Sequence, residues 1–435
     1  MKTFRPWDLE QTWLLPPSVL DFVPSEHPAH FVRDLVRESL DLGEIYATYT
    51  EERGFPPYHP AMMTALILYA YSQGIFSSRK IARACTQRVD FMAVTGLQKP
   101  NFRTVNKFRG RHLVALSNLF RQVLTLCRKA GLAKLGHVAI DGTKLKANAS
   151  KHKAMSYARM KKAEDEDARI IADWFAQSEE ADRADDELHG DESSGDEMPK
   201  WVANREKRLQ KIQEAKAALE EEAKQEAEVR DVIRAQGRKP KHKSDGTPGD
   251  KSQRNFTDPD SKILKTADGY IQGFNGQIAV DADHQIIVAH ALTNQQNDVE
   301  MLHPVLALVK KNTGRQAKEV SADAGYCSEK NLRHLKRRHV RGYIATGRQR
   351  RGGGLQRSRL GRKTGTATHE MRLRLAKAGF RSRYRLRKHV VEPVFGQIKS
   401  ALGFTRFLLR GLDKVRHEWA MVCMASNLRK LAALT

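Results

Sequence analysis

The chain has 435 residues, and its 76 Lys and Arg outweigh 51 Asp and Glu to give a formal net charge of +25. No apolar run approaches the roughly 18 residues of a membrane-spanning helix, and the N-terminus has no signal-peptide core. Hydrophobic residues make up 40%, enough for a sizeable core. The length favours two or more domains, or one domain with a large insertion. The positive charge indicates a polyanionic partner, and for a soluble chain that is first of all nucleic acid.

The four cysteines are far apart in the sequence and lack the spacing of a zinc site. We expect reduced thiols in a cytoplasmic protein, and a bacterial, nucleoid-associated location would suit the charge.

The first part of the chain has the period of amphipathic helices. From about residue 15 to residue 132, apolar residues recur at steps of three and four. Pro28 and Pro60 stand where first helical turns would begin. We therefore predict an all-α, DNA-binding domain at residues 1–132.

Two short basic helices within this domain are the candidates for DNA contact. One follows Ser77 or Ser78, and the other begins near Asn101. Joined by a turn, they resemble a helix-turn-helix, although an ordinary pair of solvated helices is the alternative. The basic residues predicted to contact DNA are Arg79, Lys80, Arg83, Arg103 and Arg109.

A carboxylate ends the first predicted strand. In "GHVAIDGTKLKANAS" (residues 136–150), an apolar run predicts a short buried strand that Asp141 terminates. The α/β pattern is then interrupted. Residues 164–197 are strongly acidic and look disordered, whereas Trp201 to about Ala235 predicts a long solvated helix, or half of a helical hairpin. We predict a helical and disordered insertion at residues 151–262.

The α/β pattern resumes after the insertion and continues to the C-terminus. Two apolar runs flank "DADH" and predict a hairpin, and a helix capped by Asn297 or Asp298 leads to a strand that ends at Asp323. A basic helix, a short strand, a Gly/Arg-rich loop and a helical part that includes Glu392 follow. Residues 133–435 are thus predicted to form one α/β domain around the insertion.

Three carboxylates from this domain can meet. Two strands joined through a helix usually run parallel, so Asp141 and Asp323 would lie at one edge of the sheet if their strands are neighbours. Glu392, on a helix across that edge, would complete a cluster, although Pro393 disfavours helical geometry at Glu392. Carboxylates held close together require a cation, and oxygen ligands suit Mg²⁺ or Mn²⁺. Two such ions can clamp the attacking and leaving oxygens of a phosphoryl displacement. Each carboxylate taken alone is also consistent with an ordinary turn, cap or surface residue.

Three segments of the chain are similar to the DDE transposases of bacterial insertion sequences. "AIDGTKLKANAS" resembles their first-Asp segment and "SADAGYCS" their second. "YRLRKHVVEPVFGQIKSALGF" resembles the third, in which Tyr, Arg, Glu and Lys recur at set spacing. The steps from Tyr384 to Arg387 and from Glu392 to Lys399 match that spacing. One extra residue separates Arg387 from Glu392, so Lys388 is the alternative for the arginine position.

The resemblance implies a fold and an activity. The fold would be a ribonuclease-H-like mixed sheet flanked by helices, with an all-α N-terminal domain and a helical insertion after the first strand. The enzyme would bind double-stranded DNA at terminal inverted repeats as a homo-oligomer, hydrolyse the end with metal-activated water, and join the freed 3′-hydroxyl to target DNA. Asp141, Asp323 and Glu392 would be catalytic residues and ligands of two Mg²⁺ ions, with Mn²⁺ as an alternative. The residues implied to contact DNA are Tyr384, Arg387, Lys388 and Lys399.

Two other functions stay open. A ribonuclease-H-like nuclease that does not transpose would cut DNA without joining it. A catalytically silent DNA-binding protein, such as a decayed copy, would keep the basic surface alone. The three intact acidic positions argue against decay.

Overall fold

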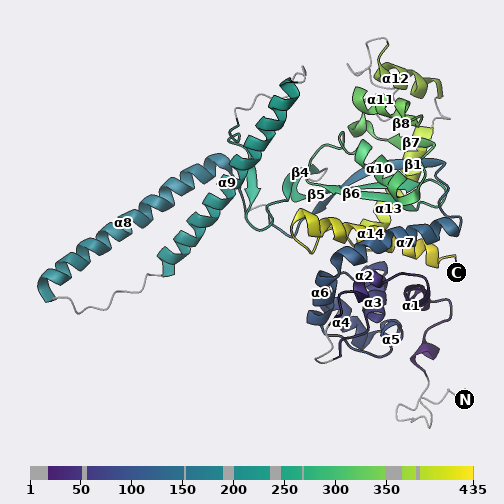
Figure 1. The fold of residues 1–435 in the computed structure, drawn as a ribbon, viewed down its shortest axis with the longest axis horizontal. Coiled ribbons are helices and arrows are strands. Elements are labelled where there is room, and N and C mark those ends of the chain that lie inside the picture. Colours follow the sequence, from purple (N-terminus) through teal and green to yellow (C-terminus); the bar gives the residue numbers. More distant parts are fainter. Residues whose placement is uncertain are drawn as a thin grey trace, which may run out of the picture. The chain divides into compact units, whose positions relative to one another are not determined.

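The computed structural model describes residues 18–50, 56–150, 153–189, 200–235, 246–266, 269–347, 365–378 and 383–434 (Figure 1). These residues fall into two compact units. The first takes in the described parts of Met1–Leu145, Asn275–Leu409 and Asp413–Thr435, and the second those of Lys146–Phe274 and Arg410–Leu412. None of the described helices is long and apolar enough to cross a membrane.

The N-terminal part of the first unit is helical, as the periodicity predicts. After a 3-10 turn, η1 (Val19–Phe22), its helices are α1 (Pro28–Glu38), α2 (Gly43–Tyr46), α3 (Pro60–Ser72), α4 (Ser78–Gln87), α5 (Val89–Thr95), α6 (Phe102–Arg111) and α7 (Leu113–Lys129). Pro28 and Pro60 occupy first helical positions, where the missing N–H has no helical partner to lose. His27 and His59 cap the same two helices, because each ring Nδ1 accepts a hydrogen bond from the N–H two residues on.

The predicted pair of basic helices is part of a group of three. α5 lies between α4 and α6 in the chain, so the prediction of two helices joined by a simple turn is wrong. α4 packs against both α5 and α6. Ile81, Phe91 and Val105, one from each helix, are completely buried. Asn101 caps α6, since its Oδ1 accepts a hydrogen bond from the Thr104 N–H at 2.9 Å.

A mixed sheet forms the centre of the α/β part. The strands are β1 (His137–Lys146), β4 (Lys262–Thr266), β5 (Gly269–Asp281), β6 (Ile287–Thr293), β7 (Glu319–Ala322) and β8 (Arg341–Ile344). They follow the order β4, β5, β1, β7, β8, and β6 also pairs with β5. β5 is antiparallel to β4 and β6, which confirms the predicted hairpin. β1, β7 and β8 run parallel.

Helices and short turns surround the sheet of the first unit. They are α10 (Leu302–Thr313), η3 (Ala324–Tyr326), α11 (Glu329–Arg337), α12 (Ala367–Ala378), η5 (Arg383–Arg385), α13 (Leu386–Gly396), the π-helical turn η6 (Gln397–Ala401) and α14 (Leu412–Ala432). α12 was not predicted from the sequence.

α14 is bound to the sheet through two buried side chains. The Trp419 ring lies against β5 at Gly276, where an added Cβ would stand 3.0 Å from the indole, and its Nε1 donates to the Gln277 carbonyl at 3.2 Å. Asn427 accepts from the Ile287 N–H and donates to the Ile287 carbonyl, both at 2.8 Å. The Asn427 amide therefore satisfies both backbone groups of a residue at the start of β6.

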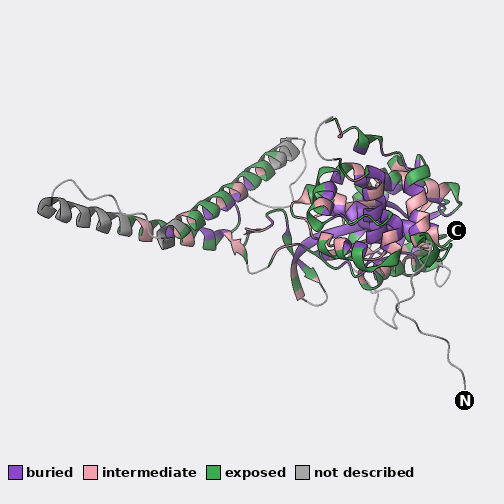
Figure 2. Ribbon diagram, turned by 90° about the horizontal axis from the view of Figure 1, so that it is seen from below, coloured by how far each residue is buried: buried purple, intermediate pink, exposed green. Residues whose placement is uncertain are grey.

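The second unit is built on a helical hairpin. α8 (Tyr157–His189) packs against α9 (Lys200–Ala235), and two short strands, β2 (Ala154–Ser156) and β3 (Gln253–Asn255), pair beside them. Where the two helices meet, an apolar cluster consists of Tyr157, Met160, Ile212, Ala215 and Leu219. Figure 2 shows buried positions along this hairpin. Asp167 forms ion pairs with Arg205 at 2.9 Å and Arg208 at 3.5 Å.

The hairpin corrects one expectation about the insertion. The acidic segment from residue 164 was predicted to be disordered, but α8 continues through it to His189. The apolar cluster and the Asp167 ion pairs explain the beginning of this helix. The rest of the acidic segment, residues 190–199, and the first 17 residues of the predicted N-terminal domain lie outside the described residues. The predicted domain boundaries stay predictions.

The attachment of α14 to β6 can be tested with Asn427→Ala. The variant leaves two buried backbone groups of Ile287 without partners, at a cost of about 1–3 kcal/mol each. We expect the free energy of unfolding, measured with urea, to fall by about 2–5 kcal/mol. Lys414→Ala, an exposed change on the same helix, should stay within about 0.5 kcal/mol. Equal effects of the two variants would contradict the role assigned to Asn427.

Candidate active site

The parallel pairing of β1 and β7 brings two of the predicted carboxylates to the same edge. Ile140 is opposite Ala322 in the register, so the next residues along the two strands are Asp141 and Asp323. The predicted parallel direction is confirmed, and the two strands are the neighbours that the cluster of carboxylates required. Asp141 does not end its strand, however, because β1 continues to Lys146. Asp323 directly follows β7 and caps η3 by accepting a hydrogen bond from the Gly325 N–H at 2.8 Å.

Burial dominates the electrostatics of both carboxyls. It raises the pKa of Asp141 from 3.8 to about 6; Arg387 opposes this shift, and the nearby Asp323 adds to it. Burial also raises the pKa of Asp323, to which the charge of Asp298 contributes. Two partly desolvated acids at one edge of the sheet thus carry negative charge that the surrounding protein compensates incompletely.

Arg387 lies between two of the predicted ligands. One guanidinium nitrogen is 2.5 Å from Asp141 Oδ2, and another is 4.0 Å from Glu392 Oε1. The Arg387 side chain is only 13% exposed, whereas that of Glu392 is 55% exposed. Its guanidinium also lies 5.9 Å from the Tyr384 ring centre. In this arrangement Arg387 is a counter-charge to the carboxylates, which differs from its expected contact with DNA. Lys388 is exposed.

Glu392 is helical despite the proline that follows it. α13 continues through Pro393, contrary to the expectation of non-helical geometry at Glu392. Pro393 has no N–H for the carbonyl of His389, four residues earlier. Gln285 fills the gap, because its Nε2 donates to that carbonyl at 2.9 Å.

Lys399 does not continue a regular α-helical face from Glu392. The π-helical turn η6 begins at Gln397 and changes the register before Lys399. The Lys399 Nζ donates to the Lys144 carbonyl of β1 at 3.3 Å, and burial lowers its pKa. Its amine is therefore held near the strand that carries Asp141.

A fourth carboxylate, which the sequence analysis assigned to a helix cap, belongs to this edge of the sheet. Asp298 Oδ1 accepts from Asn275 Nδ2 and from Gln277 Nε2, both at 2.7 Å. The Tyr326 hydroxyl in turn donates to Gln277 Oε1. The cap prediction is wrong, because α10 begins after Met301 without a side-chain cap. The available signal was a pair of amides two residues apart, Asn275 and Gln277, in the buried part of β5.

The glycines of the two Asp segments are required by this close packing. A Cβ on Gly142 would lie 2.8 Å from Asp298 Oδ1 and 3.0 Å from Asn275 Oδ1. A Cβ on Gly325 would lie 3.0 Å from Asp323 Oδ1 and 3.3 Å from Asp298 Oδ2. Both positions lack room for a side chain, so glycine lets the backbone approach the carboxylate and amide groups.

Four of the predicted DNA contacts in the N-terminal part are accessible. Arg79, Lys80 and Arg83 on α4 and Arg103 on α6 are exposed. The guanidinium groups of Arg79 and Arg103 lie 5.3 and 5.8 Å from the ring centre of Phe102. The two helices thus present a shared basic face around one aromatic ring.

The structure contradicts the fifth predicted contact. Arg109 is only 4% exposed. Its guanidinium donates to the Phe76 carbonyl at 2.7 Å, to the Tyr71 hydroxyl at 3.4 Å and to Asn106 Oδ1 at 3.1 Å. Arg109 therefore links α6 to the region around α3 and is not available to DNA.

The donor set fits a hard divalent cation in its chemistry. Asp141, Asp323 and Glu392 offer only oxygen ligands, and two of them are partly desolvated neighbours. Within the described part of the chain, no three His, Cys, Asp or Glu side chains lie close enough together to hold a metal ion. Glu392 stands apart from the two aspartates, with Arg387 between them.

Comparison with known families identifies the chain. A family model described as "Transposase DDE domain" matches residues 238–428, and one described as "Transposase domain (DUF772)" matches residues 17–111. The chain belongs to the DDE-type insertion-sequence transposases. No curated protein and no solved structure matches it. The first match includes Asp323 and Glu392 of this transposase, and the second includes its basic helices α4 and α6. Asp141 lies outside both matches.

The raised pKa of Asp141 predicts a specific pH dependence of stability. The folded protein binds this proton more tightly than the unfolded chain, so the carboxyl stabilises the fold at low pH. That contribution is lost as the pH rises from about 4 to about 6. Asp141→Asn cannot titrate. The wild type should lose this contribution between pH 4.5 and pH 7, whereas the variant should not. The free energy of unfolding of the variant, minus that of the wild type, should therefore be about 1–3 kcal/mol larger at pH 7 than at pH 4.5. Urea unfolding in EDTA measures both values. An identical difference at the two pH values would contradict the raised pKa.

Proposed function

We propose that this transposase cleaves DNA at the ends of its insertion sequence and joins the freed 3′-hydroxyl to target DNA. The observation that carries the proposal is the β1–β7 register, which makes Asp141 and Asp323 neighbours. The same two residues head the segments that resemble the family's first two acidic motifs. Glu392, linked to Asp141 through Arg387, is the third acid.

The proposed fold of the catalytic part is ribonuclease-H-like. A mixed sheet supports it, with the β5–β6 hairpin on one side of β1 and the parallel strands β7 and β8 on the other. A helix late in the chain, α13, supplies the third acid, as expected for such a site.

Asp141, Asp323 and Glu392 would hold the metal, which we propose to be two Mg²⁺ ions, with Mn²⁺ as a substitute. When bound, these ions supply a hydroxide or 3′-alkoxide nucleophile near neutral pH and stabilise the leaving oxygen. Glu392 is exposed and lies on a helix anchored by Val390, Val391 and Val394, which are buried. Its side chain is therefore free to change rotamer while the backbone stays in place.

The remaining residues of the site position groups and balance charge. Asn275 and Gln277 fix Asp298, whose second oxygen faces Gly325 and the Asp323 side. Arg387 offsets the charge of Asp141. Exposed Lys388, and Lys399 beside β1, are the cations proposed to contact phosphates next to the scissile bond, with Tyr384 beside them.

We propose that the terminal inverted repeats bind the basic face of α4 and α6, as double-stranded DNA, with the protein acting as a dimer on paired ends. The α8–α9 hairpin is the segment proposed to pair subunits or ends. Its helices already bury their shared apolar face, so the contact would use its charged outer surface.

The three carboxylates provide the direct test of catalysis. Asp141→Asn, Asp323→Asn and Glu392→Gln should each reduce Mg²⁺-dependent cleavage of a terminal-repeat duplex to background, because each replaces a charged carboxylate ligand of the metal with a neutral amide. Binding of the same duplex in EDTA should change less than about threefold. Asp283→Asn, in the exposed β5–β6 turn, is the matched control and should cleave normally.

The products separate the proposed reaction from simple nuclease activity. Wild-type protein should yield joined products with a target duplex as well as cut ends. Cutting without joining would indicate a nuclease that does not transpose. Full cleavage by Glu392→Gln would remove Glu392 from the site.

The basic face of α4 and α6 has its own test. Changing Arg79, Lys80, Arg83 and Arg103 together to Gln should weaken binding of terminal-repeat DNA. The slope of log K against the logarithm of the salt concentration should also become less steep by about 2–4, since each lost phosphate contact reduces that slope by about 0.9. Arg121→Gln with Lys129→Gln, two exposed cations on α7, is the control. A quadruple variant with unchanged affinity would exclude this face from end recognition.

A further inference from the structure

We propose that α11, together with β8 and α12, forms a second DNA-binding surface, which holds the phosphates of a target duplex independently of its sequence. The choice of target DNA as the partner rests on the proposed function. The surface itself is argued from charge, packing and its place beside Asp323.

α11 has one buried face and one strongly basic face. Leu332 and Leu335 are buried against the rest of the unit. The exposed cations on the helix are Lys330, Arg333, Lys336 and Arg337. At steps of three, three and one residue, they lie along one side of the helix.

The acid at the start of α11 does not neutralise this face. Glu329 accepts hydrogen bonds from the N–H groups of Ala367 and Thr368, at 3.1 and 2.8 Å. Its carboxylate thereby caps the first turn of α12, and it lies 3.5 Å from Arg333 Nε. The carboxylate thus joins α11 to α12 and, on α11, pairs with Arg333. Lys336 pairs with Glu370 of α12, so the excess positive charge of this face comes from Lys330 and Arg337.

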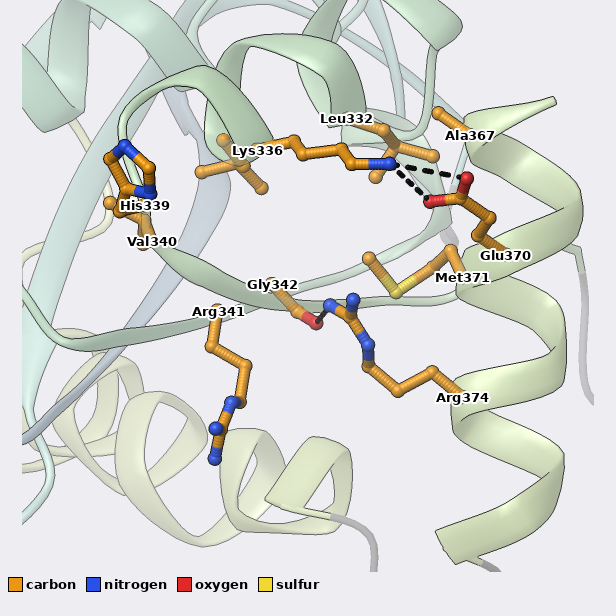
Figure 3. A pocket seen from close by; sticks show the side chains of 11 residues that line it. Leu332, Lys336, His339, Val340, Arg341, Gly342, Ala367, Glu370, Met371 and Arg374 are labelled. Carbon is orange, nitrogen blue, oxygen red and sulfur yellow. Dashed lines mark hydrogen bonds and ion pairs between the residues drawn. The ribbon is translucent and has the colours of Figure 1, made fainter.

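A basic cavity of about 270 Å³ opens beside this face (Figure 3). Its walls come from α11, β8 and α12. Lys336 from α11 is paired with Glu370 at 3.2 Å. Arg374 from α12 donates to the Gly342 carbonyl at 3.1 Å, which fixes α12 along β8, the last strand of the sheet order. Arg341 on β8, which pairs with Glu319 at 3.5 Å, is the third cation of the lining, so basic side chains continue from the helix to the sheet.

Two stacked histidines, one on α10 and one on α11, lie close to the cations of this surface. The rings of His303 on α10 and His334 on α11 stack with centres 3.7 Å apart. Burial, together with the charges of His334, Lys330 and Arg338, lowers the pKa of His303 to about 4. Burial and the neighbouring cations likewise lower the pKa of His334.

The basic face begins next to the candidate active site. α11 starts six residues after Asp323. Its Asn331 donates to the Tyr326 carbonyl at 2.8 Å and to the Val299 carbonyl at 2.6 Å. These bonds tie the first turn of α11 to η3 and to the residue that follows Asp298. A nine-residue helix is about 13 Å long, which corresponds to about four base-pair steps of 3.4 Å. A duplex along α11 would thus reach the carboxylates at one end.

The chemistry of the surface favours sequence-independent contact. Lys and Arg on one helix face bind phosphates as charges, and phosphate contacts carry no base information. Contact of this kind fits a duplex held without regard to its sequence, as proposed for the target, whereas specific recognition of terminal repeats would need contacts to bases.

The test uses a triple variant, Lys330→Gln/Arg333→Gln/Arg337→Gln, in the full-length protein. Its control, Lys310→Gln/Lys311→Gln/Arg315→Gln, removes three exposed cations from the end of α10 and the turn after it, so net charge falls equally. Fluorescence anisotropy in EDTA measures binding of a random-sequence duplex from 0.05 to 0.3 M KCl. We expect the triple variant to bind at least about tenfold more weakly at 0.1 M, with a salt slope smaller by about 2–3. The control should change affinity less than about threefold. Circular dichroism confirms that both variants fold.

The second arm identifies the duplex. Terminal-repeat binding and end cleavage by the triple variant should stay within about twofold of wild type, while joining to target falls at least tenfold. If the triple variant bound terminal-repeat and random duplexes with equally reduced affinity and still joined ends to target normally, the assignment of this surface to target DNA would be wrong. An unchanged salt slope would show that this surface does not bind DNA. It would then be a solvated face or a site for an acidic protein segment. If wild-type protein neither cuts nor joins, the proposed function fails, but the slope still decides whether this surface binds DNA.

Discussion

The structure of the site depends on one parallel strand pair. The β1–β7 register sets Ile140 opposite Ala322, and it thereby forces Asp141 and Asp323 to follow side by side. Like charges in this position repel, and burial makes the repulsion stronger. The neighbouring groups offset this repulsion. Arg387 supplies positive charge, and the amides of Asn275 and Gln277 hold a further carboxylate, Asp298, in a fixed orientation.

The same arrangement explains why polar groups occupy the middle of a sheet. Asn275 and Gln277 are buried on β5, where apolar residues would pack at lower cost. Each amide has a partner, and Tyr326 closes the network on Gln277. On the same strand, Trp419 covers Gly276 and bonds to the Gln277 carbonyl. The C-terminal helix thus fixes the backbone from which the amides extend, so a polar site and an apolar core share one strand.

Local sequence signals predicted the parts of this structure that depend on neighbouring residues. Pro28 and Pro60 marked helix starts, and the alternation of strands and helices gave the parallel pairing behind Asp141 and Asp323. Contacts between distant segments could not be read in this way. The burial of Arg109 depends on the Phe76 carbonyl, and the role of Asp298 depends on β5, both far away in the chain. The π-helical turn before Lys399 was equally hidden, because its residues have no distinctive local pattern.

The crowded glycines have a consequence for judging copies of such an element in a genome. Intact acids at the three expected positions argue against decay, but they are not the only positions on which the arrangement depends. Gly142 and Gly325 have no space for even one methyl group without displacing Asp298, Asn275 or Asp323. A copy that keeps every acid but carries alanine at either glycine would therefore hold those acids in a different arrangement.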